Sequence, residues 1–318
     1  MEFAPAASRY LLEDTQLAVR SNCVQRRSKR AGFMVVIIGF IIVTACVLGG
    51  FAISGGQVGA LIHPAEILTI GGASLGALVV MSPVKVMKDL MKGILQSLKG
   101  TPFNKAAYEE LFKAMYELFR LARRSGFLSL EPHLSNPHDS AIFQKYPKVA
   151  GNHHVMEFIC GLLTPIMDGS VSPQKLPELI DAELKAMEIE HHAPIGVLSK
   201  TADALPGFGI VAAVLGIVIT MGAIDGPVEE IGHKVGAALV GTFLGILLSY
   251  GLFGPMATKL EFMGEAEMAY FKAIAAIVTG FVNDMPPKVA IDLARRGLSS
   301  EMRPTQEELE VLLKSAET

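Results

Sequence analysis

Two apolar runs decide the fold of this chain: LPGFGIVAAVLGIVITMGAI at residues 205–224 and VGAALVGTFLGILLSYGLFGPMAT at residues 235–258. Neither run contains a charged residue. Because a helix rises about 1.5 Å per residue, each run can cross a hydrocarbon core of about 30 Å. Both runs therefore predict membrane-spanning helices, and the short segment between them predicts that the two helices form a hairpin.

A second pair of apolar runs lies upstream, at residues 33–53 and 67–81. The later run is shorter and rich in glycine, which is typical of a membrane helix that packs closely on its neighbours. The composition agrees with four spans, because 51% of the 318 residues are hydrophobic and only 19% are charged. Residues 265–284 are also apolar, but charged residues interrupt them. The apolar residues Phe271, Ile274, Val278 and Phe281 recur at helical spacing, which predicts an amphipathic helix and not a fifth span.

The distribution of lysine and arginine sets the expected sidedness. Basic residues lie before the first span, between the second and third spans and after the fourth, whereas the two short loops contain only Lys234. We therefore predict an all-α integral membrane protein whose four transmembrane helices form two hairpins, with both termini in the cytoplasm. The expected segments are an N-terminal extension at 1–32, transmembrane helices at 33–53, 65–84, 204–224 and 235–258, periplasmic loops at 54–64 and 225–234, a large helical cytoplasmic domain at 85–203 and a cytoplasmic tail at 259–318.

The extension before the first span carries RRSKR at 26–30, directly ahead of an apolar run that is too long for the core of a signal peptide. We therefore expect no cleavage here, and the first span should remain in the mature protein. The basic cluster would lie at the cytoplasmic lipid surface, where it adds anchoring and no chemistry.

The segment between the two hairpins predicts helices and no sheet. Apolar residues from Tyr108 to Ala122 recur at i, i+3, i+4 and i+7, and Ser125-Gly126 predicts the end of that helix. A second helix is expected over HHVMEFICGLLTPIM at 153–167, before Asp168-Gly169. A third is expected to start at Ser172-Pro173, with serine as the cap and proline in the first turn, and to run through LPELIDAELKAMEIE.

The sequence contains no motif for a cofactor, a metal or a covalent reaction. No P-loop or GxSxG motif is present, the histidine pairs at 153–154 and 191–192 have no metal-ligand spacing, and three distant cysteines predict neither a disulfide framework nor a metal site. A net charge of −3 gives no general attraction to nucleic acid. We therefore expect no enzymatic activity, no cofactor and no nucleic-acid partner, and an ion gradient is the remaining energy source.

The spans themselves lack an ionisable residue at depth. Glu66, Asp203 and Asp225 all lie at the ends of apolar runs, where solvated or capping roles are expected. If ions cross the membrane here, another chain must therefore supply the carboxylate.

Small residues and two prolines mark the spans. Gly72-x-x-x-Gly76, Gly209-x-x-x-Ala213 and Gly241-x-x-x-Gly245 each line one helix face and predict close packing, within the chain or with another chain. Pro206 fits the first turn of a helix capped by Asp203, whereas Pro255 should kink a helix that continues into the tail. Thr242 either bonds back to its own helix or faces a pore and contacts a cation.

These residues carry a resemblance to a known family. DALPGFGIVAAVLGIV at 203–218 and VGTFLGILLSYGLFGP at 240–255 resemble the paired pore helices of MotA-type flagellar motor stator subunits, within the MotA/TolQ/ExbB proton channel family. The resemblance extends to PAEILTIGGASLGALVV at 64–80, RSGFLSLE at 124–131 and SSEMRP at 299–304. Residues 1–33 lack a counterpart.

The resemblance implies a pore made with a partner chain. It implies a homo-oligomer, a ring of five of these subunits, around two copies of MotB, whose single span brings the ion-binding aspartate. Pro206 and Pro255 would shape the cytoplasmic end of the pore, and Ala213 and Thr242 would line it. Sodium-driven relatives usually have threonine at the position of Ala213, so the resemblance implies proton as the coupling ion.

The resemblance also implies contact with the rotor protein FliG. Arg123 and Glu131 match the charged pair of the family, and Arg124 and Arg120 are neighbouring alternatives to Arg123. The alternatives to a flagellar stator are an ExbB- or TolQ-type energiser of outer-membrane transport, which typically has three spans, and a structural membrane scaffold, which leaves Pro255 and the charged 120–131 segment without a role.

Overall fold

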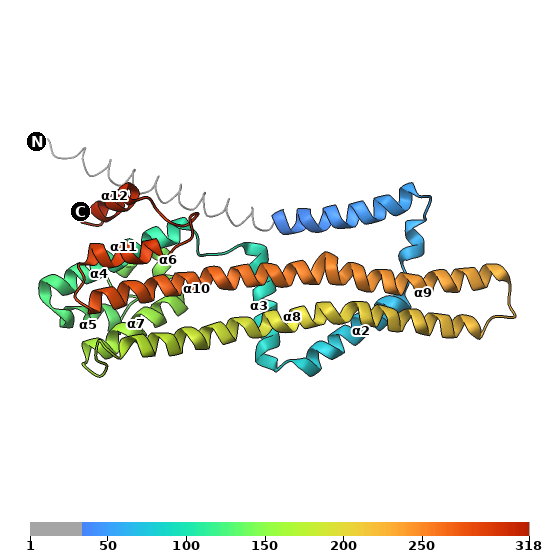
Figure 1. Ribbon diagram of the computed structural model, residues 1–318, viewed down its shortest axis with the longest axis horizontal. Helices are drawn as coiled ribbons and strands as arrows, with labels where there is room; N and C mark the ends of the chain where they lie inside the picture. The colour runs from blue at the N-terminus through green and yellow to red at the C-terminus, as the bar shows by residue number, and fades with distance from the viewer. Residues whose placement is uncertain (1–33, 318) are drawn as a thin grey trace, which may run out of the picture. The chain divides into compact units, whose positions relative to one another are not determined.

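The computed structural model describes residues 34–317, and within them every regular element is a helix (Figure 1). Four helices are long and apolar enough to cross a membrane. They fall within Met34–Ile53, Val58–Met81, Leu176–Met221 and Val228–Val282. The all-helical membrane fold predicted from the sequence is therefore confirmed. The expectations for residues 1–33 lie outside the described residues.

The chain divides into two compact units. The first, which we call the membrane unit, comprises the described residues up to Thr101 together with His192–Phe262. The second, the polar unit, comprises Pro102–His191 and the described part of Met263–Thr318. Two long helices, α8 (Leu176–Met221) and α10 (Gly254–Val282), contribute residues to both units.

The membrane unit contains both hairpins. The helix Met34–Ile53 leads through the 3₁₀ turn η1 (Val58–Leu61) to α2 (Pro64–Met81), which starts with proline in its first turn and packs on α9 (Val228–Leu248). Ile70 of α2 and Leu205 and Ala212 of α8 share one buried cluster. A further helix, α3 (Val84–Lys99), follows α2 and packs against α8 and α10.

The polar unit is built around α4 (Lys105–Ser125) and the end of α10. The remaining elements are η2 (Phe127–Leu130), α5 (Glu131–Ser135), η3 (Phe143–Lys145), α6 (Pro147–Ala150), α7 (His153–Met167), α11 (Pro287–Arg296) and α12 (Gln306–Ser315).

Burial on one face of α10 explains why residues 265–284 are apolar without spanning a membrane. Phe271, Ile274, Val278 and Phe281 recur at helical spacing and are buried in the core of the polar unit. The rings of Phe281 and Phe119 of α4 stack with their centroids 3.9 Å apart. The predicted amphipathic helix is confirmed.

Local signals placed two helices of the polar unit correctly. The side chain of Asn104 caps α4 by accepting a hydrogen bond from the backbone N–H of Ala107, and α4 ends at Gly126, whose φ of +87° favours glycine. The boundaries of α7 are those predicted from the sequence, with Asn152 as its cap.

The predicted start of the third helix of this region was wrong, and so was the prediction that a separate helix begins near Pro206. Residues 173–175 form a turn, and α8 starts at Leu176 instead of at Ser172-Pro173. The helix then continues through Pro194 and Pro206 to Met221, so Pro206 is an internal residue and does not start a helix. A long helix accommodates an internal proline because the loss of one backbone hydrogen bond is spread over many intact turns.

Candidate functional site

The crossing of α8 and α9 is the closest helix contact in the predicted pore region. A Cβ atom placed on Gly245 would lie 2.6 Å from the carbonyl oxygen of Leu205 and 3.0 Å from the Cα of Gly209. A Cβ on Gly209 would lie 2.9 Å from the carbonyl oxygen of Gly241. Backbone therefore meets backbone at this crossing, and only glycine fits.

Two of the three small-residue motifs are thus paired with each other inside the chain. The motif at 209–213 on α8 faces the motif at 241–245 on α9, which settles their partner in favour of the intrachain alternative. The third motif behaves differently, since a Cβ on Gly72 or Gly76 of α2 would meet nothing within 4 Å.

Ala213 and Thr242 both lie at the α8–α9 crossing. The backbone nitrogen of Ala213 is 3.5 Å from a Cβ placed on Gly241, the neighbour of Thr242. The hydroxyl of Thr242 donates to the carbonyl oxygen of Gly209 across the crossing, at 3.5 Å. By contrast, the Thr220 hydroxyl donates to its own helix, to Gly216 at 2.7 Å. Of the two alternatives for Thr242, a bond back to its own helix is therefore not the one observed, since its hydroxyl reaches the neighbouring helix α8.

The uncovered side of α8 borders these residues. Ile210, Val214, Ile217 and Met221 recur at i, i+4, i+7 and i+11, and each is exposed in the single chain. Pro206 and Ala213 lie along the edge of this apolar stripe by their helical positions, and both are half-buried. The stripe gives α8 a second face on which a further helix can pack.

The segment before Pro255 leaves the α-helical pattern, at the place where the sequence predicted a kink. Residues Ser249–Phe253 (η4) form a π-helical turn between α9 and α10, in which the N–H of Gly254 donates to the carbonyl oxygen of Ser249. Pro255 follows directly in the first turn of α10 and is exposed. Such turns are rare and occur frequently at functional sites.

The structure also places Glu66 where the sequence did not lead us to expect it. Glu66 belongs to the first turn of α2, and its Oε2 atom lies 2.8 Å from the position of a Cβ on Gly241. A residue interpreted as solvated thus reaches the α8–α9 crossing. Nothing close to Glu66 in the sequence signals this contact, because its neighbour Gly241 belongs to α9, which lies far along the chain.

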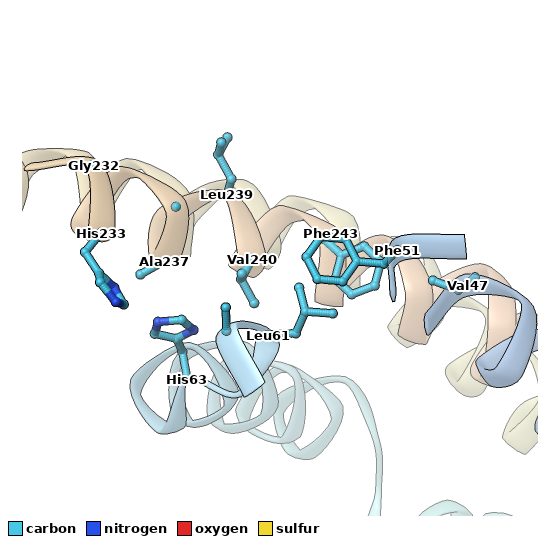
Figure 2. Close-up of a pocket in the computed structure, with 12 residues that line it drawn as sticks. Val47, Phe51, Leu61, His63, Gly232, His233, Ala237, Leu239, Val240 and Phe243 are labelled. Atoms are coloured by element: carbon cyan, nitrogen blue, oxygen red, sulfur yellow. The ribbon is translucent and has the colours of Figure 1, made fainter. Parts of the chain in front are cut away.

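A separate apolar cavity of about 540 Å³ lies in the membrane unit between the helix Met34–Ile53, the segment before α2 and α9 (Figure 2). The rings of His63 and His233 point toward each other in it. The Nδ1 atom of His63 is buried and has no hydrogen-bond partner in the described part of the chain. None of the predicted pore residues lines this cavity.

The predicted rotor-binding residues lie in the polar unit, at the end of α4 and the start of α5. Arg124 and Glu131 are exposed, and neither forms an ion pair within residues 34–317. Arg123 is also exposed, but its Nη2 atom donates to the backbone carbonyl of Asp284 at 2.6 Å. Asp284 connects α10 to α11 with a φ of +62°, which is unusual for a residue other than glycine.

Arg120 is committed to a different contact. It is half-buried and lies 3.7 Å from Glu317, which also accepts a hydrogen bond from the Tyr116 hydroxyl at 2.6 Å. The four predicted residues therefore divide into Arg120 and Arg123, which hold the polar unit together, and Arg124 and Glu131, which are free to meet a partner.

The histidine pairs meet an acidic residue of α10. His191 Nε2 lies 3.5 Å from Glu267 Oε2. Burial raises the pKa of the Glu267 carboxyl above its ordinary value, and His191 and His154 oppose this rise only in part. Within the described residues no group of three or more histidine, cysteine or acidic side chains is arranged to hold a metal ion.

Comparison with known families matches the chain in two segments. Residues 37–126 match the family described as motility protein A N-terminal, and residues 149–273 match the MotA/TolQ/ExbB proton channel family. The chain is 35% identical to motility protein A of Salmonella typhimurium over 277 residues, which are 87% of this chain and 94% of that protein. It is 37% identical to the chemotaxis protein LafT of Vibrio parahaemolyticus over 280 residues, 88% of this chain and 98% of that protein.

Solved structures agree on the fold. The structure of MotAB from Campylobacter jejuni is similar with a TM-score of 0.70 at 21% identity, over 86% of this chain and 99% of that chain. The flagellar MotAB stator complex from Bacillus subtilis gives a TM-score of 0.67 at 26% identity, over 86% of this chain and 98% of that chain.

Proposed function

Because this chain belongs to the motility protein A group of the MotA/TolQ/ExbB proton channel family, we propose that it is a flagellar motor stator subunit that converts proton flow into torque. The similarity over nearly the whole length of curated motility proteins carries this proposal. It is a multi-pass protein of the bacterial inner membrane, with both termini in the cytoplasm by the distribution of its basic residues.

The proton-binding group comes from a partner in this proposal. Neither 205–224 nor 235–258 contains a carboxylate, so a MotB-type subunit with a single span supplies an aspartate. The apolar stripe from Ile210 to Met221 on α8 is a surface that suits such a span. Five copies of this chain around two partner helices form the ring implied by the family.

The chemistry follows from the cost of a charge in hydrocarbon. A carboxylate on the partner helix is costly in the membrane until it takes up a proton, and neutralisation changes which α8 surface it packs against. Pro206 and the π-helical turn at 249–253 lie toward the cytoplasmic end of this path, where they provide places at which the helices can bend. The ring then steps around the partner.

The polar unit passes this step to the rotor. We assign contact with the rotor protein FliG to the exposed Arg124 and Glu131, with Arg123 beside them. Charges of complementary sign on the rotor set the register of this contact more than its strength.

Proton uptake into vesicles tests the channel. Liposomes containing this chain and the single-span protein encoded beside it should acidify under an inward proton gradient. A matched complex whose partner carries Asp→Asn in its span should not. Equal uptake by both complexes, or uptake by this chain alone, would contradict the proposal. An ExbB- or TolQ-type role is less favoured because residues 37–126 match the motility-specific N-terminal family.

A further inference from the structure

The helix α3 carries two uncovered stripes side by side. One is apolar, with Val84, Met91 and Leu95 exposed by 62%, 58% and 55%. The other is basic and consists of Lys88, Lys92 and Lys99, which lie on adjacent positions of the same helix surface and are exposed. A solvated helix would carry polar residues on both stripes, so the apolar stripe needs a cover.

The opposite face of α3 is fixed in place. Leu90 is buried in a cluster with Leu198 of α8 and Ala257 and Leu260 of α10. The buried Ser97 hydroxyl lies 3.6 Å from the sulfur of Met256. The helix therefore presents its two stripes in a set direction, away from α8 and α10.

The direction of α3 places these stripes at a membrane surface. The helix begins two residues after α2 ends at Met81, the last residue of the second span. Figure 1 shows α3 running across α8 and α10 and not along them. Because α8 and the α9–α10 segment cross the membrane, a helix laid across them lies in the membrane plane, at the cytoplasmic end of the second span.

We propose that α3 is a membrane-surface helix whose lysines bind the phosphate groups of anionic phospholipids in the cytoplasmic leaflet. The apolar stripe enters the acyl region beside the headgroups, and the lysines lie at the headgroup level. This inference rests on the membrane location of the spans and on the sidedness proposed above, and it is independent of the stator role.

Charge complementarity favours this occupant over a second copy of the chain. The single acidic residue of α3 is Asp89, which lies 3.9 Å from Lys92 and leaves a net positive charge on the helix. The cytoplasmic leaflet carries negative surface charge. A second copy that packed through its own α3 would bring its lysines to the same surface, and the like charges would repel. A neighbour in a ring would present a different surface, and the quenching test below distinguishes that case from lipid contact.

The chain contains no tryptophan, which permits a direct test. Leu95→Trp gives the full-length protein a single indole on the apolar stripe, and lipids with brominated acyl chains quench indole fluorescence on contact. In bilayers, brominated phosphatidylglycerol should quench this indole at about tenfold lower mole fraction than brominated phosphatidylcholine, since each basic residue adds to the preference for anionic lipid. A second variant, Leu128→Trp in the polar unit, should escape quenching.

Substitution of the lysines should remove the preference for anionic lipid, while the indole at position 95 should still contact the acyl chains. In the Leu95→Trp background, Lys88→Gln with Lys92→Gln and Lys99→Gln should make the two lipids equivalent quenchers, whereas Lys175→Gln with Lys185→Gln and Lys314→Gln should not. About 0.5 M salt should weaken the preference of the unaltered helix through screening. Absence of quenching in the Leu95→Trp variant would show that protein covers α3, and equal quenching before the lysines are changed would show lipid without headgroup recognition. Either result would overturn the proposal.

Discussion

At the scale of single residues, the arginines at the end of α4 have different tasks although they are adjacent in sequence. Arg123 donates to the carbonyl of Asp284, the left-handed residue between α10 and α11, and so helps to fix that connection. Arg124 is exposed and makes no such contact in the described part of the chain. Structure and partner binding can therefore be separated by substitution.

We expect Arg123→Ala to lower the stability of the chain by about 1 kcal/mol, the size of one hydrogen bond from a charged donor near the surface. Arg124→Ala should leave the thermal midpoint unchanged. Thermal unfolding of the purified chain in detergent measures both.

Motor torque should depend more on Arg124 than on Arg123, the reverse of the order expected for stability. Arg124→Glu should reduce rotation under load, and Arg124→Lys should keep most of it, as measured by the speed of tethered cells. Normal rotation under load with Arg124→Glu and Glu131→Lys combined would argue against the rotor contact.

A pH-dependent contribution to stability is expected at Glu267. Its pKa is raised in the folded state, because burial outweighs the attraction of His191 and His154. The folded chain therefore holds this proton to higher pH than the unfolded chain, and stability falls as pH rises from about 4.5 through the raised pKa. Glu267→Gln should lack this fall. Thermal midpoints between pH 4 and 8 measure it, with the exposed Glu261→Gln as control, and parallel curves for Glu267→Gln and the unaltered chain would refute it.

At the scale of elements, success in predicting boundaries depended on whether the deciding signals were local. The boundaries of α7 follow from Asn152 before it and Asp168-Gly169 after it, all within one turn of the helix. The prediction of where α8 starts was wrong because Ser172-Pro173 has the sequence pattern of a helix cap without forming one. The helix continues through Pro206 because packing on α9 outweighs the loss of one backbone hydrogen bond.

The site residues show the same division. The sequence predicted a disturbance of the helix at Pro255, where the structure has a π-helical turn, and it located the small-residue motifs through their spacing. The sequence could not predict that two of the motifs pack on each other while Gly72 and Gly76 contact no other helix of the chain. The spacing of small residues predicts which face of a helix they line, but not which helix packs against that face. Glu66 was misplaced for this reason, since its role depends on α9, which lies far along the chain.

We expect Gly245→Ala to disrupt the membrane unit, because the new methyl group would meet the backbone of Leu205 and Gly209, which cannot yield as a side chain can. Gly72→Ala is the matched control, since open space surrounds it within the chain. Amounts of folded protein extracted from membranes should fall several-fold for the first variant only. Equal extraction of the two would show that the α8–α9 contact is looser than described.

At the scale of the whole molecule, each unit has a buried core of its own. The core of the polar unit draws on α4, α7 and the end of α10, while the membrane unit is held by two smaller clusters around Ile70 and Leu90. Changes in one core should therefore leave the other unit folded.

The coupling ion is a property of the assembled channel. Ala213 offers no side-chain oxygen to a dehydrated sodium ion at the α8–α9 crossing, so we expect swimming speed to be independent of sodium concentration at a fixed proton-motive force. Complemented cells tracked from about 1 to 100 mM sodium measure this. A steep rise of speed with sodium would exclude proton coupling, and Ala213→Thr alone need not change the ion because the partner helix also lines the path.

The π-helical turn at Ser249–Phe253 makes one stretch of the chain tolerant of a change in length. A π turn holds one residue more than an α turn. Removal of a single residue from it therefore restores a regular α-helix and keeps the faces of α9 and α10 in the same rotational register. The same deletion at residues 242–246 or 258–262 would rotate everything that follows by about 100°. Phe271 and Phe281 would then leave their core. A scan of one-residue deletions, read by the amount of folded protein in membranes, should show tolerance confined to this turn. Loss of motility in those folded variants would show that rotation needs the bend.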